Sequence, residues 1–126
     1  MKWSSAIGLL VCGFMLLSGC GGKQPAADQA AEKKPYLQAA VTVNGTTASI
    51  AIQTDLIISK AHYNQERVPG EGHIHMSVDN GENIIVTEDH TELTDLAPGP
   101  HNVKLSLHNN DHTPYDVSQS IDFEVK

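Results

Sequence analysis

From residue 36 to residue 126 the chain consists of short segments in which apolar and polar residues alternate. Since successive side chains of a β-strand point to opposite faces, a period of two is typical of strands that bury one face. Gly, Asn, Asp and Pro separate the segments, and no stretch has the 3.6-residue period of a helix. The alternating or β-branched segments are 41–43, 48–52, 73–79, 84–87, 103–108 and 121–125. They predict an all-β domain, a single antiparallel β-sandwich of about seven strands.

The first twenty residues have a different character. Lys2 precedes an apolar run from Ala6 to Leu17, which is shorter than the ~20 residues that cross a bilayer. A basic start followed by a short apolar run is typical of an export signal. The run ends in Leu17-Ser18-Gly19-Cys20. This ending resembles the lipobox of bacterial lipoproteins, in which the cysteine thiol is acylated and becomes the first residue of the mature chain.

The resemblance implies three parts: a lipoprotein signal peptide (1–19), a lipidated Cys20 with a flexible tether (20–35), and the β-sandwich domain (36–126). The tether has few apolar side chains to bury, which favours flexibility. We therefore expect a lipoprotein held to the extracytoplasmic face of a cell membrane by palmitate or a similar acyl chain on Cys20. Cys12 would leave with the signal, so no free thiol would remain for catalysis or metal binding.

Acidic residues dominate the charge, with 15 Asp and Glu against 8 Lys and Arg. This balance argues against nucleic acid as a partner, because such binding depends on basic residues that neutralise phosphates. Seven histidines are present, which is many for a chain with few aromatic residues. His62, in the polar loop 60–72, and His90, in a predicted connection at 88–91, are expected to be solvated.

The segment Leu96–His101 has the sequence Leu-Ala-Pro-Gly-Pro-His. It resembles the Leu-x-Pro-Gly-x-Tyr turn of fibronectin type III-like domains, where the tyrosine anchors the corner by a hydrogen bond to the backbone. The resemblance implies an immunoglobulin or fibronectin type III-like sandwich. His101 replaces the tyrosine, and we expect one of its ring nitrogens to donate to a backbone carbonyl. Its predicted role is structural.

His73 and His75 open one of the alternating segments. A period of two places both imidazoles on one face of the strand, about 6.6–7 Å apart along it. Ile74 and Met76 then face the core, and the two histidines are predicted to lie on an exposed face. A His-x-His pair on a rigid strand is a recurrent metal-ligand arrangement. The alternative is that both are solvated polar residues without a ligand.

Two further histidines are expected to join this pair. In immunoglobulin-like sandwiches the third and sixth strands are antiparallel neighbours, so the strand that begins at His73 should pair with the strand that ends at His108. His108 is out of phase with the apolar residues of its own strand and should face outward. His112 follows in the next loop, and Asp111 is a candidate oxygen ligand or a partner for an imidazole.

These positions predict a surface metal site with His73, His75, His108 and His112 as candidate ligands. Cu(II) and Zn(II) are the possible cofactors, because imidazole suits both and no thiolate is present to favour Cu(I). Since the ordinary pKa of histidine is about 6.5, binding is expected to weaken strongly below about pH 6. The motifs Gly-His-x-His and Leu-x-Pro-Gly-x-His resemble those of a family of small exported bacterial domains of unknown activity, which implies only an extracytoplasmic β-domain.

No catalytic motif is present: the chain has no Gly-x-Ser-x-Gly, no phosphate-binding loop and no His-Glu-x-x-His. A sandwich of this size leaves little room for a substrate cleft, and we expect no enzyme activity. Two functions remain open. The first is binding or handling of a transition metal by a membrane-anchored domain. The second is a cell-envelope module that binds a partner protein or a glycan and no metal.

Overall fold

The computed structural model describes residues 33–126, so the predicted signal peptide, Cys20 and most of the tether lie outside the described residues. The described residues form eight strands and no helix, and therefore no helix long and apolar enough to span a membrane. The strands are β1 (Leu37–Asn44), β2 (Thr47–Thr54), β3 (Ile57–Ile58), β4 (Glu71–Val78), β5 (Ile84–Val86), β6 (His90–Leu93), β7 (Gly99–His108) and β8 (Pro114–Val125).

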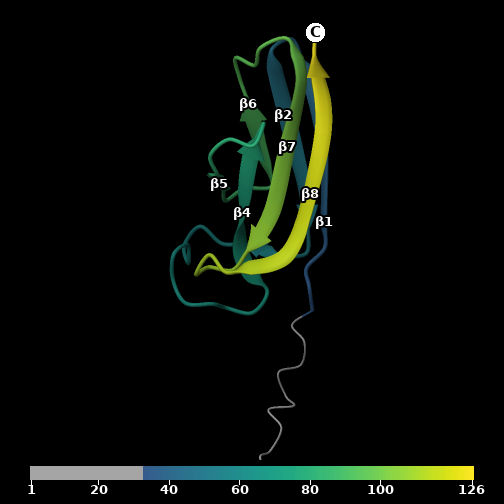
Figure 1. Ribbon diagram of the computed structural model, residues 1–126. Coiled ribbons are helices and arrows are strands. Elements are labelled where there is room, and N and C mark those ends of the chain that lie inside the picture. Colours follow the sequence, from purple (N-terminus) through teal and green to yellow (C-terminus); the bar gives the residue numbers. More distant parts are fainter. Residues whose placement is uncertain (1–32) are drawn as a thin grey trace, which may run out of the picture. The chain divides into compact units, whose positions relative to one another are not determined.

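The strands build two sheets, which Figure 1 shows as two layers. One sheet has the order β1-β2-β6, and the other has the order β3-β4-β7-β8 with β5 paired to β4. All pairs are antiparallel except β3 with β4. The all-β sandwich that the alternation predicts is confirmed.

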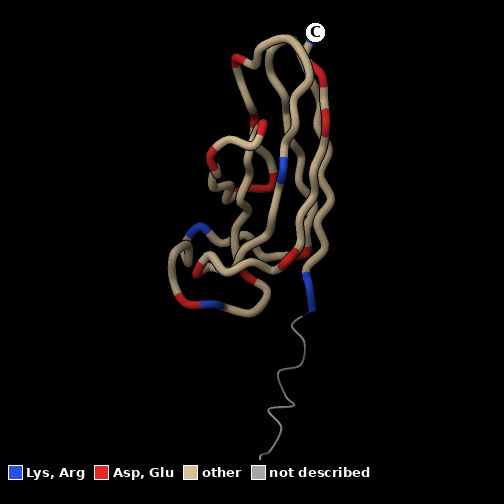
Figure 2. The backbone as a smooth tube through the Cα atoms, viewed as in Figure 1, with Lys and Arg blue, Asp and Glu red and all other residues tan. Residues whose placement is uncertain are grey.

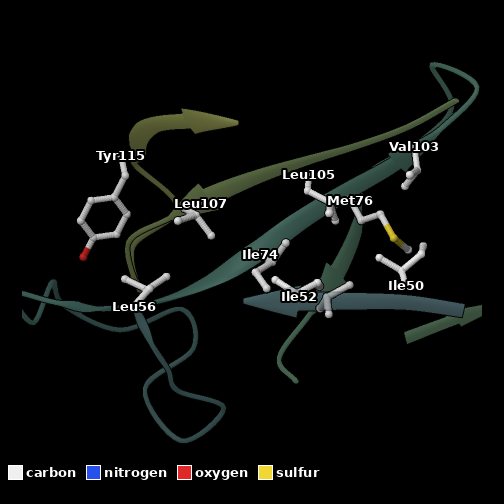
Figure 3. Packing of buried hydrophobic residues seen from close by; sticks show 10 residues of the cluster. Ile50, Ile52, Leu56, Ile74, Met76, Val103, Leu105, Leu107 and Tyr115 are labelled. Carbon is white, nitrogen blue, oxygen red and sulfur yellow. The ribbon is translucent and has the colours of Figure 1, made fainter. Parts of the chain in front are cut away.

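The core lies between the two sheets (Figure 3). Ile50 and Ile52 of β2 contribute from one sheet, and the second sheet contributes from β4 and β7. The strands β2 and β7 bury alternate residues, as the period of two requires, whereas β4 buries Gly72 and His73 in addition to Ile74 and Met76. The buried set is Ile50, Ile52, Leu56, Ile74, Met76, Val86, Val103, Leu105, Leu107 and Tyr115. Met76 is therefore a core residue, and its sulfur is not available to a metal on the outer face.

The structure corrects the predicted position of His90 and shows one short strand that the sequence pattern does not define. His90 is not in a connection, because it begins β6, which pairs with β2. Its imidazole is nevertheless exposed, with Nδ1 2.8 Å from a carboxylate oxygen of Asp89. The segment Leu56–Ile58, whose pairing the sequence leaves open, provides β3, a two-residue strand parallel to the start of β4.

His101 fixes the corner that leads into β7. Its Nε2 donates to the carbonyl oxygen of Ala97 at 2.6 Å, which is the backbone hydrogen bond expected of it. Its Nδ1 lies 2.7 Å from Asp79 Oδ2, and the N–H of Asn102 donates to the other Asp79 oxygen at 2.8 Å. Both ring nitrogens are thus donors to the protein, so neither is available to a metal.

This corner predicts a pH dependence of stability. The pKa of His101 is raised, first by its bond to Ala97 and then by Asp79. The pKa of Asp79 is lowered, first by the Asn102 N–H and then by His101. The pair stabilises the fold between the ordinary pKa values of 3.8 and 6.5, and this stabilisation is lost as pH rises through the raised pKa of His101 or falls through the lowered pKa of Asp79.

The variant Asp79→Asn isolates this contribution, since asparagine tolerates the left-handed backbone of residue 79 (φ 51°). In thermal melts the variant should be less stable than the wild type near pH 5.5, and the gap should narrow as pH rises through the raised pKa of His101. A gap of equal size at every pH would contradict the ion pair.

Candidate metal centre

The pairing of β4 with β7 brings the first histidines together. His73 is opposite His108 and His75 is opposite Ser106 in an antiparallel register, so the predicted pairing of these two strands is confirmed. Gly72 makes this approach possible. A Cβ atom on Gly72 would overlap the carbonyl oxygen of His108 and lie 3.0 Å from its carbonyl carbon. Only glycine lets the start of β4 lie this close to the end of β7.

The prediction that His73 is exposed is wrong, because its exposed fraction is 0%. The loop between β3 and β4, which lies beside the turn between β7 and β8 in Figure 1, contacts His73. The ring of Tyr63 in that loop meets the rings of His73 and His112 edge to face, with centroids 4.9 and 5.1 Å apart. The Asn64 N–H donates to the Asn110 carbonyl at 2.9 Å and so ties the loop to the turn.

Three imidazole nitrogens converge under this loop. His73 Nε2 lies 2.9 Å from His75 Nε2 and 3.2 Å from His112 Nδ1, and the last two atoms are 3.4 Å apart. Each of these nitrogens is either a hydrogen-bond donor, when it carries a proton, or an acceptor, when it carries a lone pair. Three of them cannot all be satisfied by one another, because at least two like groups must face each other. A cation at the centre accepts all three lone pairs at once.

The distances also fit such a cation. With metal–nitrogen bonds of about 2.0–2.1 Å, nitrogens separated by 2.9–3.4 Å subtend about 90–110° at the ion. These angles lie between those of octahedral and tetrahedral coordination. Among the described residues, His73, His75 and His112 are the group of histidine and acidic side chains placed to hold a metal ion.

His112 occupies an unusual backbone position. It ends the turn Asn109–His112, in which the His112 N–H donates to the Asn109 carbonyl at 2.9 Å, and its φ is 71°. Hairpin loops commonly need one left-handed residue at this place, and glycine is the usual choice. Histidine adopts this conformation at a cost, and such strain is often found at functional sites. Here it turns the imidazole back toward β4.

Asn64 sets the proton position on His112. The Oδ1 of Asn64 lies 3.2 Å from His112 Nε2, so Nε2 must carry the proton and Nδ1 presents its lone pair to His73 and His75. A hydrogen bond of this kind to the far nitrogen orients metal-ligating histidines in many proteins. Tyr63 and Asn64 were missed by the sequence analysis, which treated residues 60–72 as a solvated loop. The one signal was an aromatic residue in an otherwise polar loop.

His108, the fourth candidate ligand, lies against the cluster but does not point into it. Its ring stacks on that of His75 with centroids 3.7 Å apart. Its Nδ1 donates to the His112 carbonyl at 3.0 Å, and its Nε2 accepts from the Ser106 hydroxyl at 3.0 Å. Both nitrogens are therefore engaged by the protein. The structure assigns His108 to the support of His75 and of the turn, and not to the group of ligands.

The nearby carboxylates are also engaged elsewhere. Asp111 Oδ1 accepts from the backbone N–H and the hydroxyl of Thr113, at 3.0 and 2.6 Å. Glu71 Oε2 lies 2.7 Å from His62 Nδ1, so the exposed His62 is hydrogen-bonded to Glu71 rather than to solvent alone. Asp111, a candidate oxygen ligand in the sequence, does not join the three nitrogens.

The surroundings of His73 and His75 favour the neutral form of both rings. The pKa of His73 is lowered from 6.5 to about 4, first by burial and then by repulsion from the other three imidazoles. Burial, followed by His108 and His112, lowers the pKa of His75 to about 4. These lowered pKa values mean that His73 and His75 should remain neutral at a lower pH than an exposed imidazole, so binding through these two rings should weaken at a lower pH than the ordinary pKa predicts. Because the unfolded chain takes up these protons first, the metal-free fold loses stability as pH falls from 6.5 to about 4.

His73 differs from His112 at its far nitrogen. Its Nδ1 is buried and has no hydrogen-bond partner among residues 33–126. A buried polar atom left unpaired costs about 1–3 kcal/mol. His73 therefore lacks the orienting hydrogen bond that Asn64 gives to His112, and the packing of its ring holds Nε2 toward His75 and His112.

Comparison with known proteins identifies the fold. No protein-family model and no curated protein sequence matches this chain. The crystal structure of the PKD1 domain of Epp from Vibrio anguillarum superposes with a TM-score of 0.51 at 13% identity, covering 75% of this chain and 96% of that one. The fold is immunoglobulin-like. The PKD1 domain of the metalloprotease PrtV from Vibrio cholerae gives 0.48 at 13% identity, covering 72% and 95%. At this identity the likeness concerns the fold alone.

Proposed function

We propose that this chain is a membrane-anchored, non-catalytic extracytoplasmic lipoprotein whose immunoglobulin-like domain binds a divalent transition metal, copper or zinc, through His73, His75 and His112. The observation that carries the proposal is the convergence of three imidazole nitrogens within 2.9–3.4 Å of one another. The ligands come from one strand and one turn, which the pairing of β4 with β7 holds together. This rigidity means that little order has to be created when the ion binds.

The donor set narrows the choice of metal. Imidazole suits Zn(II), Cu(II) and related ions, whereas Ca²⁺ and Mg²⁺ require oxygen ligands. In the order of divalent affinities Cu(II) exceeds Zn(II), so copper should bind more tightly when both are present. The acidic charge of the domain, spread over the molecule in Figure 2, further favours cations near its surface.

The position of the site agrees with an anchor on Cys20. Lys33 and Pro35, where the chain enters the domain, line a pocket together with the end of the β3–β4 loop and the start of β8, at Pro69, Gly70 and Tyr115. The loop that covers the histidines thus ends near the point where the chain enters the domain. A tether of the kind expected for residues 20–35 reaches about 20 Å, so an acyl chain on Cys20 would keep the domain within about that distance of the membrane surface.

Calorimetric titration of the purified protein with CuCl₂ and ZnCl₂ near pH 7.5 tests the metal proposal. We expect one ion per chain, with binding abolished by EDTA and greatly weakened in the double variant His73→Ala/His75→Ala. The variant His62→Ala, which removes a surface histidine outside the cluster, should bind like the wild type. If the double variant retains wild-type affinity, the three histidines are not the metal site; if the wild type binds neither metal, the alternative of a cell-envelope interaction module is favoured.

The anchor has a separate test. Replacing Cys20 by Ser removes the thiol that accepts the acyl chain, so incorporation of an alkyne-labelled fatty acid into the protein should be lost. The variant should also leave the membrane fraction. Equal labelling of wild type and Cys20→Ser would contradict the lipoprotein assignment without affecting the metal site.

A further inference from the structure

We infer that the metal held by His73, His75 and His112 keeps one open coordination position, which takes a small anionic donor from solution. This inference rests on the proposed function. It concerns the class of small molecule that the metal would bind in addition to the three histidines.

The first observation is that the three nitrogens lie on one side of the ion. The angles of about 90–110° that they subtend are those of three neighbouring corners of a tetrahedron or an octahedron. At least one coordination position on the opposite side is left without a ligand from this group. Zinc sites with three protein ligands keep water or substrate at that position, whereas closed structural sites supply four ligands.

The second observation is that the nearest remaining donors are held elsewhere. His108 is the only other imidazole in ring contact with the cluster among residues 33–126, and its two nitrogens bond to the His112 carbonyl and to Ser106. To become a ligand, the ring would have to break both bonds and its stack on His75. The Asp111 carboxylate accepts a hydrogen bond from Thr113, and the Glu71 carboxylate is hydrogen-bonded to His62.

The third observation is charge. All three ligands are neutral imidazoles, so a divalent ion keeps its full charge of +2 in the site. Such a centre favours an anion at the open position over a further neutral donor. His75 and His112 are only half-buried, and Tyr63, which contacts His73 and His112, is 37% exposed, so a small anion can reach the site from solvent. The ligand class is therefore a small monodentate anion.

Azide titration of the copper-loaded protein tests this inference, because azide bound to Cu(II) gives a ligand-to-metal charge-transfer absorption band. We expect the band to appear and to saturate at one azide per copper, with copper retained by the protein after gel filtration. An unchanged spectrum at saturating azide, with copper still bound, would show a closed site. Release of copper from the protein on adding azide would also overturn the inference.

The variant His108→Ala provides the matched control, since it removes the one imidazole able to fill the open position. The band should appear in both proteins when it is expressed per bound copper, although the variant, which lacks the support that His108 gives to His75 and to the turn, should bind copper more weakly. A band that appears only in the variant would identify His108 as a fourth ligand and overturn the inference, while leaving the metal proposal intact. Failure of the wild type to bind copper at all would overturn the proposed function itself.

Discussion

Gly72→Ala is expected to destabilise the domain by about 2–3 kcal/mol or more, at the upper end of what overpacking costs. The added methyl group would overlap the His108 carbonyl oxygen, which is backbone and cannot rotate away as a side chain would. Gly72 is also tied on its other side, where its carbonyl accepts from the Ser59 N–H at 2.9 Å. The strand therefore cannot relieve the clash without losing its pairing with β3 or with β7.

Urea denaturation measures this change as a lower midpoint at constant slope. The control is Gly45→Asn, at a turn with a φ of 61° where no atom lies within 4 Å of an added Cβ and where asparagine is tolerated. That variant should stay close to the wild type. A Gly72→Ala protein as stable as the wild type would contradict the close approach of β4 and β7 on which the site depends.

His112→Gly is expected to lower the affinity for Cu(II) and Zn(II) by about 100-fold or more, because loss of a residue that only orients a ligand already costs 10–100-fold. The same change should leave the metal-free protein as stable as before. At a φ of 71°, glycine avoids the strain of an L-residue, which offsets the lost hydrogen bond to Asn64. Calorimetry and thermal melts of the same variant separate the two effects.

The companion variant His112→Asn keeps a side chain that tolerates the left-handed conformation and removes the imidazole. It should lose affinity in the same way. Retention of wild-type affinity by both variants would remove His112 from the ligand set, whereas a large loss of stability in both would show that the imidazole mainly supports the turn.

The strand alternation predicted the sandwich and the inward face of β4, because Ile74 and Met76 can be buried on only one side of a strand. The pairing of His73 with His108 followed from strand order in immunoglobulin-like domains and is present in the structure. The Leu-x-Pro-Gly-x-His corner likewise gave the His101 hydrogen bond. These features depend on local pattern and on topology, which the sequence expresses directly.

The depth of the site could not be predicted in the same way. His73 is buried because a polar loop folds back over it, and this depends on contacts of Tyr63 and Asn64 with residues far along the chain. His112 points toward His73 and His75 because its own backbone is left-handed, whereas the ring of His108 does not point toward them. Neither the folding back of a loop nor a positive φ in a turn produces a periodic sequence pattern. The set of four candidate ligands could therefore be reduced to three only from the structure.

The most direct test of the metal centre is the anomalous X-ray scattering of crystals of the protein grown with Zn(II) or Cu(II), recorded on both sides of the absorption edge of the metal. The account predicts one strong peak about 2.0–2.1 Å from His73 Nε2, His75 Nε2 and His112 Nδ1, with His108 still bonded to Ser106. A peak at the exposed pair of His62 and Glu71, or no peak among the three histidines at full metal occupancy in solution, would contradict it.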